Sequence, residues 1–212
     1  MKNIMPTQEK INANYLLFIE YLEKYDCYSE EMIKEIGDKI KMAPYSKEVG
    51  FGGAEPGSLI DVTLYKLCKI GAQINANVLG KNGGDTISHP NLCVNQYMLM
   101  RVLLLMNIAK AEIFEPVTED WKTRRGIMYD FVEMKTKMKL GQRSLYLCQK
   151  YGIKLSEEEF DAFSTIDISD ETGERFLSPL YAVVKTAKML TLIELRQEYL
   201  KTVEQNKFEQ EK

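Results

Sequence analysis

Few side chains in this sequence could carry catalytic chemistry, and His89 is the only histidine among them. A histidine that acts as a general base needs a nucleophile within hydrogen-bond reach and a third group that orients its ring. No such pair can be named for His89, which lies directly before Pro90. The sequence therefore favours a turn residue ahead of a helix-starting proline over a catalytic base.

The four cysteines, at positions 27, 68, 93 and 148, are the next candidates. They form no CxxC pair and no metal-finger spacing, and three of them lie inside apolar helical patterns. A cysteine in such a pattern usually packs as a small hydrophobic residue. We expect the cysteines to be reduced and structural.

The glycine cluster Gly50-Phe-Gly-Gly-Ala-Glu-Pro-Gly57 could approach a phosphate closely. It lacks the Gly-Lys-Ser/Thr ending of a P-loop and the Gly-x-Gly-x-x-Gly fingerprint of dinucleotide-binding folds. We therefore expect a conformational loop that leads into a helix.

A basic run between residues 122 and 143 is the one marked charge asymmetry, because its seven cations outnumber Asp130 and Glu133. Such a run could bind phosphate groups of a nucleotide, a nucleic acid or an acidic partner. It could equally be a solvent-exposed face whose positive charge is offset by acidic residues elsewhere in the fold. We expect Trp121, beside this run, to be anchored on the core. The cations are Lys122, Arg124, Arg125, Lys135, Lys137, Lys139 and Arg143.

Helices are the elements predicted to position these residues. Residues 8–24 place apolar side chains on one helical face after Thr7, a favourable N-cap. Ser29 can cap a second helix, which should end near Met42 because a residue before proline avoids the helical region. Ser58 can cap a long central helix.

The block from Leu92 to Ala109 is apolar nearly all round, which predicts the most buried helix of the fold. Residues 112–141 contain helix-breaking proline and glycine, so we expect a short helix near Asp120 and brief extended structure around 127–132. A helix over 142–151 should follow.

Two later helices have clear start signals. Ser156-Glu-Glu-Glu159 is a capping box, so a helix should open at Glu157. Ser178 and Pro179 should start a long terminal helix. No internal repeat or alternating strand pattern is present, so the predicted class is all-α.

The length, composition and net charge of the whole chain exclude several classes of protein. With 212 residues, 45% hydrophobic and 28% charged, the chain can bury one core as a globular protein. A net charge of -3 gives no global reason to bind nucleic acid. The N-terminus lacks a signal-peptide run, and the most apolar stretch, 97–109, is too short to span a bilayer. We expect a soluble, non-secreted protein without a membrane partner.

Two segments resemble the metal-binding landmarks of the HD-domain superfamily of metal-dependent phosphohydrolases. Leu104-Leu-Met-Asn-Ile-Ala-Lys110 is similar to the family's Leu-Leu-His-Asp-Ile-Gly-Lys, with Met106 and Asn107 at the His-Asp pair. Ala54-Glu-Pro-Gly-Ser-Leu-Ile-Asp-Val-Thr-Leu64 resembles Ala-Tyr-Pro-Gly-Gly-Leu-Leu-Glu-His-Thr-Leu, with Val62 at the first histidine ligand.

Two more landmarks follow in the family's order. Gly141-Gln-Arg-Ser144 and Leu155–Ala162 look like its Gly-x-x-Ser and Leu-x-x-Glu-Glu-x-x-Ala helices, although the histidine that usually follows is absent. Lys188 follows Ala187 where the family has an Ala-Asp pair.

The resemblance spans residues 43–195 and implies an HD-like helical bundle. We expect helices in 1–42 to pack on this bundle and 196–212 to form a charged C-terminal helix or tail. The terminal segment keeps apolar residues at helical spacing, which fits either a helix that docks on a partner or second copy, or a frayed tail.

The substitutions at the landmarks argue against metal chemistry. An HD site binds divalent cations through imidazole and carboxylate groups. Val62 cannot ligate, Met106 offers a soft thioether, Asn107 is neutral, and Lys188 adds a cation. We expect no metal and no cofactor. Isolated acids near helix starts usually cap helices or face solvent. We therefore do not expect the following acids to replace the missing metal ligands: Glu55, Asp61, Glu159 and Asp167.

The leading hypothesis is a non-catalytic HD-like domain, a pseudoenzyme that acts as a structural or protein-interaction subunit. Divergent HD-like proteins of this size occur in tailed-phage genomes, so the resemblance implies a virion or assembly component, with a protein partner or self-assembly. One alternative is a nucleotide or nucleic-acid binding module that uses the basic run 122–143. Another is a divergent metal-dependent phosphohydrolase with relocated ligands.

Overall fold

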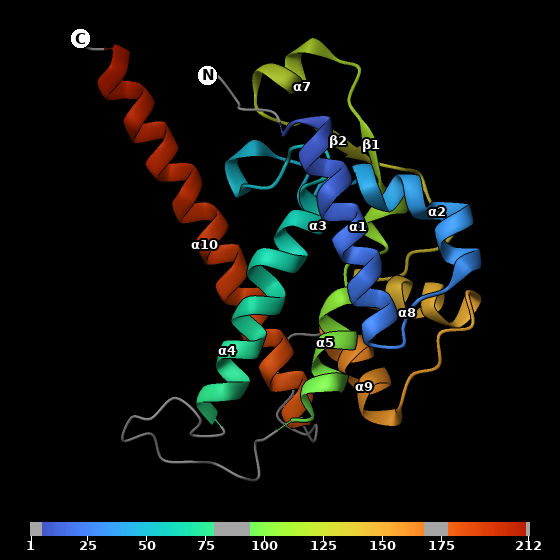
Figure 1. Cartoon of the computed structure of the whole chain (residues 1–212). Helices are drawn as coiled ribbons and strands as arrows, with labels where there is room; N and C mark the ends of the chain where they lie inside the picture. Colours follow the sequence, from blue (N-terminus) through green and yellow to red (C-terminus); the bar gives the residue numbers. More distant parts are fainter. Residues whose placement is uncertain (1–5, 79–93, 168–177, 211–212) are drawn as a thin grey trace.

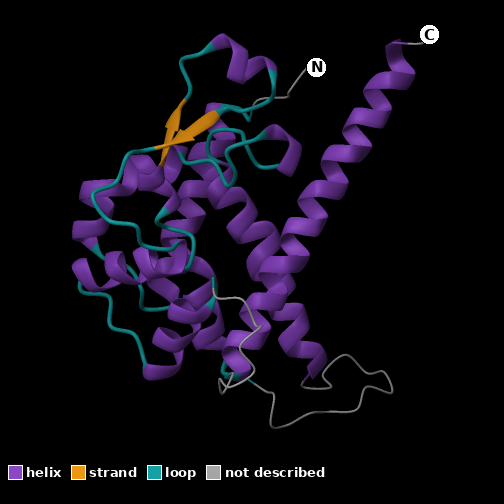
Figure 2. Ribbon diagram, turned by 180° about the vertical axis from the view of Figure 1, so that it is seen from behind, coloured by secondary structure: helices purple, strands orange, loops and turns teal. Residues whose placement is uncertain are grey.

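A computed structural model of the chain describes residues 6–78, 94–167 and 178–210. Within these ranges the fold is helical apart from one two-stranded sheet (Figure 2), so the predicted all-α class is confirmed. His89, Cys93 and the predicted helix start at Pro90 lie outside the described residues. None of the described helices has the length and apolar character that crossing a membrane requires.

The first two helices begin and end at the local signals in the sequence. They are α1 (Gln8–Lys24) and α2 (Glu30–Met42). The Thr7 hydroxyl accepts a hydrogen bond from Lys10 N at 3.3 Å, and the Ser29 hydroxyl accepts one from Met32 N at 3.4 Å. The backbone leaves the helical conformation at Ala43, the residue before Pro44, as predicted.

The central helix is continuous but contains one wider turn. It consists of α3 (Ser58–Val62), the π-helical turn η2 (Thr63–Leu67) and α4 (Cys68–Val78). The prediction that Ser58 caps it is wrong, because Gly57 is the N-cap residue and has a φ of 78°. The Ser58 hydroxyl instead donates to Gly53 O at 2.7 Å and accepts from Tyr45 N at 3.0 Å. These two bonds hold the loop of residues 50–57, called the glycine loop below, against the core.

The helix α5 (Gln96–Leu105) lies in the middle of the core, as predicted, and all of its residues from 99 to 105 are buried. One of them is Arg101, whose guanidinium lies 2.6 Å from the Glu159 carboxylate. The same guanidinium donates to the carbonyls of Tyr25, Asp26 and Lys154. A turn then leads into the short helix α6 (Lys110–Ile113).

A small unit follows that has the predicted short helix near Asp120 and the predicted extended structure within 127–132, together with a strand that was not predicted. It contains β1 (Phe114–Pro116), α7 (Asp120–Arg124) and β2 (Tyr129–Phe131), with the two strands antiparallel. The prediction that Trp121 is anchored on the core is wrong, because its side chain is 55% exposed. The reason is that α7 is a five-residue helix that buries none of its residues.

Three helices complete the fold, and each starts close to its predicted position. They are α8 (Leu140–Lys150), α9 (Glu157–Thr165) and α10 (Pro179–Gln210). The capping box of α9 is present, and the Ser178 hydroxyl accepts from Tyr181 N at 3.2 Å.

The helix α10 packs along α4 in its first part and extends beyond the helical body in its second part (Figure 1). It is continuous across residues 195 and 196, where we expected the HD-like part to end.

Candidate functional site

Two of the positions that resemble metal ligands, Val62 and Asn107, lie near the buried side chain of Tyr45. A Cβ at Gly53 would lie 3.0 Å from Tyr45 Cβ and 3.7 Å from Val62 Cγ2, so the loop passes closely between these two side chains. Val62, Met106 and Asn107 are each at most 2% exposed. The π-helical turn begins directly after Val62, and such turns often occur at functional sites.

Asn107 and Tyr45 form a buried polar pair with poor hydrogen bonding. Neither polar atom of the Asn107 side chain, nor the Tyr45 hydroxyl, makes a hydrogen bond of good geometry with a described residue. Burial raises the pKa of the Tyr45 hydroxyl, and the nearby Asn107 amide lowers it by less. The void beside Asn107 has no room for water. Unpaired buried polar groups cost about 1–3 kcal/mol each, so this pair weakens the fold.

Lys110 points its amine back onto Tyr45. Its Nζ lies 2.5 Å from Tyr45 O and 3.5 Å from the centre of the tyrosine ring. Burial of the amine is the main cause that lowers the pKa of Lys110 to about 7, although the residue as a whole is partly exposed. The ammonium of Lys188 lowers this pKa further, while Asp167 opposes it.

Lys188 is paired with Asp167 at the start of α8. Its Nζ lies 2.8 Å from Asp167 Oδ1, and Asp167 Oδ2 accepts a hydrogen bond from Gly141 N at 2.6 Å. Burial raises the pKa of Asp167, but Lys188 and the Gly141 bond outweigh burial, so the pKa is lowered. Asp167 is thus ion-paired with Lys188, and its charge also acts on the Lys110 amine.

The four acids considered as replacement ligands do not meet at one point, since Glu55 and Asp61 line one cleft and Glu159 and Asp167 do not line it. Glu159 is paired with Arg101, Asp61 bonds Lys10 and Asn14, and Asp167 bonds Lys188. In the parts of the chain that the structure describes, no three histidine, cysteine or acidic residues are arranged to hold a metal ion. The three described cysteines are free and buried, and burial raises the pKa of Cys27 and Cys68 to about 12.

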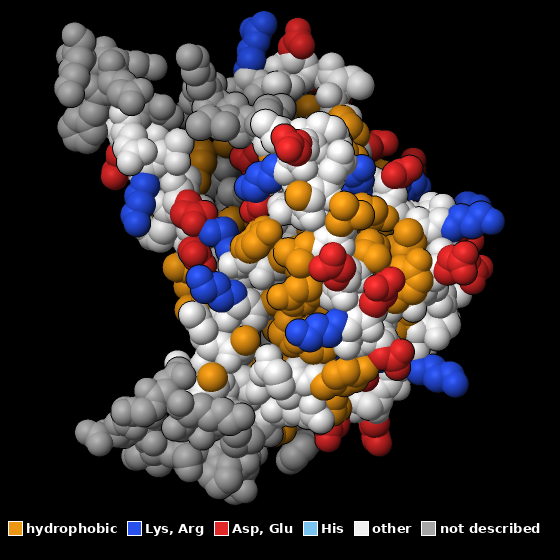
Figure 3. All heavy atoms as spheres, viewed as in Figure 1, with side chains coloured by type: hydrophobic (Ala, Val, Ile, Leu, Met, Phe, Trp, Pro, Cys, Tyr) orange, Lys and Arg blue, Asp and Glu red, His pale blue; other side chains and the backbone are white. Residues whose placement is uncertain are grey.

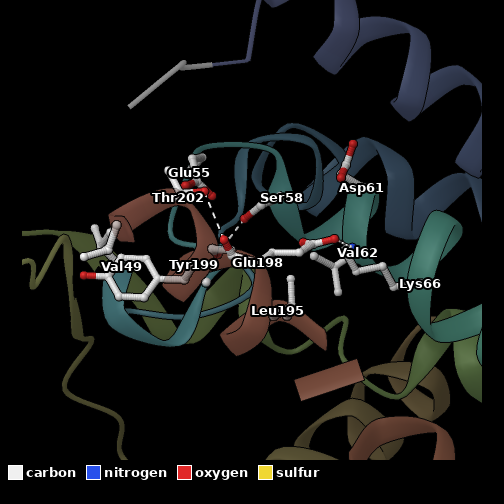
Figure 4. Close-up of a pocket in the computed structure, with 13 residues that line it drawn as sticks. Val49, Glu55, Ser58, Asp61, Val62, Lys66, Leu195, Glu198, Tyr199 and Thr202 are labelled. Carbon is white, nitrogen blue, oxygen red and sulfur yellow. Dashed lines mark hydrogen bonds and ion pairs between the residues drawn. The ribbon is translucent and has the colours of Figure 1, made fainter. Parts of the chain in front are cut away.

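A cleft of about 250 Å³ lies beside Val62, between the glycine loop and α10 (Figure 4). Glu198 of α10 reaches toward Lys66, with their charged atoms 2.5 Å apart. Burial lowers the pKa of Lys66, but Glu198 and Glu194 outweigh burial and raise it. The wall of the cleft that α10 forms was not predicted, because Leu195, Glu198 and Tyr199 face the loop only in the folded chain.

The basic run is not a continuous patch. Lys122 is bound by Glu119 at 3.0 Å and by Asp130 at 2.5 Å. Arg143 is buried and donates to Thr136. The other five cations are exposed, with the Lys139 amine 3.4 Å from Asp167 O. They are Arg124, Arg125, Lys135, Lys137 and Lys139.

The sequence did not single out Tyr45 or the role of Lys110. Tyr45 follows Pro44 without any pattern of its own, and Lys110 belongs to the Ile-Ala-Lys end of a resembling segment. Only the fold brings the two together with Lys188.

The fold and this cluster define an all-α protein with an internal site of one tyrosine, one asparagine and two lysines. No protein-family model, curated protein or solved structure matches the chain.

Proposed function

We propose that this chain is a non-catalytic HD-like domain that acts as a structural or protein-interaction subunit. The observation that carries the proposal is the filling of the four landmark positions. Val62 and Met106 pack in the core, Asn107 is buried beside Tyr45, and Lys188 is paired with Asp167. An apolar side chain in place of a buried ligand avoids the desolvation cost of an unpaired charge.

Electrostatics give a second reason. The charge of Lys188 lies close enough to Lys110 to disfavour a positive charge there. A divalent cation placed among them would face the same repulsion at short range, where the low dielectric strengthens it. The phosphohydrolase alternative would need other ligands, and three of the four acids considered are already paired: Asp61, Glu159 and Asp167.

Restoration of the four landmark residues tests the proposal. The variant carries Val62→His, Met106→His, Asn107→Asp and Lys188→Asp. If the scaffold is HD-like, this variant should bind Mn²⁺ or Ni²⁺ near one ion per chain, while the wild type binds none after dialysis. A matched control places the same residue types at scattered exposed positions: Leu16→His, Phe160→His, Gln149→Asp and Lys201→Asp.

Two outcomes would contradict parts of the proposal. Stoichiometric metal in the wild type, together with phosphodiesterase or nucleotidase turnover, would refute the non-catalytic role. A restored variant that folds by circular dichroism yet binds no more metal than the control would refute the HD-like scaffold. The phage virion or assembly context rests on the resemblance alone.

A second candidate function is binding of single-stranded nucleic acid, and exposed Trp121 favours it. The guanidinium of Arg125 lies 5.4 Å from the centre of the Trp121 ring, and exposed Arg124 is adjacent in the chain. Bases stack on such rings while cations hold the phosphates. Trp121 is the only tryptophan, so its fluorescence should fall on titration with oligonucleotide at low salt.

Charge reversal at Arg124 and Arg125 should abolish that change in fluorescence, and added salt should weaken it. An unchanged spectrum for the wild type at low salt would exclude this function.

A further inference from the structure

The helix α10 is apolar on two opposite faces. Its inner face is buried against α4, α9 and η1 (Val49–Phe51) and includes Val184, Ala187 and Leu195. Its outer face exposes five large apolar side chains by 38% to 55%. Because an apolar face of a helix normally packs against another surface, a helix with two such faces is expected to have two packing partners. These outer side chains are only about half covered: Met189, Leu190, Leu192, Ile193 and Leu200.

The outer face has the spacing of a coiled-coil seam. Three residues of this face, Met189, Ile193 and Leu200, follow one another with exposed Thr186 and Arg196 at alternating steps of three and four positions. At 1.5 Å per residue the seam is about 21 Å long. It runs from the part of α10 beside α4 into the part that extends past the helical body in Figures 1 and 2. The seam consists of Thr186, Met189, Ile193, Arg196 and Leu200.

The same seam on a second copy is a complementary partner, because two identical faces can pair about a two-fold axis. In an antiparallel register Met189 would face Leu200 of the second copy, and Ile193 would face Arg196. A parallel register would place Arg196 against its own copy, and facing like charges oppose association. The Arg196 guanidinium already bonds Gly50 O, so its aliphatic stem is left for the seam.

A rival apolar surface lies over α1. Figure 3 shows hydrophobic side chains gathered in the middle of this face, and Leu16 of α1 is 64% exposed. The aromatic rings there already pack on one another, with the centres of Tyr25 and Tyr97 5.8 Å apart. Leu16 is the only large apolar side chain of α1 that is strongly exposed, so this helix offers no repeat for a second helix.

We propose that two copies of this chain associate through an antiparallel contact between the outer faces of α10. The inference rests on the proposed role as a protein-interaction subunit and names a second copy as the partner. A seam of four turns makes a small interface, at or below roughly 1,200 Å² in total, so the dimer should dissociate in the micromolar range.

Sedimentation equilibrium of the full chain, from roughly 1 to 200 µM, measures this association. The wild type should shift from monomer to dimer across the range. Ile193→Glu should remain a monomer, since it puts a charge in the centre of the seam. Leu16→Glu, the matched control on the rival surface, should dimerise like the wild type. Leu200→Glu, farther from the core, repeats the test if Ile193→Glu fails to fold.

Cysteine cross-linking tests the register. Under mild oxidation, a mixture of Met189→Cys and Leu200→Cys chains should form a mixed disulfide, while either variant alone should not. Cross-linking of each variant alone would overturn the antiparallel register.

A wild type that stays monomeric at the highest concentration would overturn the dimer. A folded Ile193→Glu chain that still dimerises would do the same, and loss of the dimer in Leu16→Glu alone would assign the contact to α1. None of these outcomes alters the metal content of the restored variant, so failure of the dimer and failure of the proposed function are distinguishable.

Discussion

Lys110→Met should remove a pH dependence of the free energy of unfolding that originates in the Lys110 amine beside Tyr45 and Lys188. Burial and Lys188 lower the pKa of Lys110 from 10.5 to about 7. The unfolded chain therefore binds more protons than the folded chain between these two values, and stability should rise as the pH increases through this window. At about 1.4 kcal/mol per pKa unit, the gain from about pH 7 to about pH 9 is roughly 2 kcal/mol. Partial exposure of the residue reduces it to about 1–2 kcal/mol.

Urea unfolding followed by circular dichroism at several pH values provides the assay. The wild type should gain stability between about pH 7 and pH 9 relative to Lys110→Met, and the slope m should stay the same. Buried thiols such as Cys27 have a raised pKa, so they lower the stability of the fold at pH values above the ordinary thiol pKa. This effect is the same in the wild type and in Lys110→Met. Lys137→Met removes an exposed lysine and serves as the control.

Parallel pH profiles for the wild type and Lys110→Met would refute the reasoning, since they would mean that the amine titrates at its ordinary pKa. A profile in which the wild type loses stability relative to the variant above about pH 10.5 would show that folding raises this pKa.

Three further predictions concern single side chains. Tyr45→Phe should stabilise the fold by about 1 kcal/mol in urea unfolding, because it removes a buried hydroxyl without a partner. Glu159→Gln should cost about 3–5 kcal/mol in the same assay, because it leaves Arg101 charged and unpaired in the core. Gly52→Ala should lower the melting temperature, because Gly52 has a φ of 76° and an added Cβ would lie 2.9 Å from Leu195 O.

Each of these predictions has a matched control. Tyr151→Phe removes a hydroxyl that bonds Glu35 and Lys150, so it should not stabilise the fold. Lys150→Gln breaks an exposed ion pair and should change stability little. Gly152→Ala has a similar φ of 69° but open space around the added Cβ, so it should lower the melting temperature less than Gly52→Ala. Equal effects in any pair would contradict the stated cause.

Local signals predicted the helices well because capping acts within a few residues. Thr7, Ser29 and Ser156 each bond a backbone N–H three positions ahead, so sequence alone determines those helix starts. Ser58 was misassigned because its hydroxyl bonds Gly53 and Tyr45, which are near it only through the loop fold. Trp121 was misassigned because its burial depends on whether α7 packs against the core.

The candidate site was predicted only in part. The resemblance pointed to Val62, Met106, Asn107 and Lys188. In the fold Val62 and Asn107 lie near Tyr45, and Lys188 lies near Lys110. The pairing of Lys188 with Asp167 depends on the contact between α9 and α10, which no local pattern encodes. The same limit explains why the role of Lys110 emerged only with the structure.

The guanidinium of Arg101 has a consequence for any attempt to divide this chain. It is held by a carboxylate from α9 and by carbonyls from the end of α1 and from the loop before α9. A fragment that starts at residue 43 would lose Tyr25 and Asp26 and leave donors of a buried cation without acceptors. Residues 1–42 should therefore melt together with the rest of the chain in a single transition, and an excised 43–212 fragment should not fold.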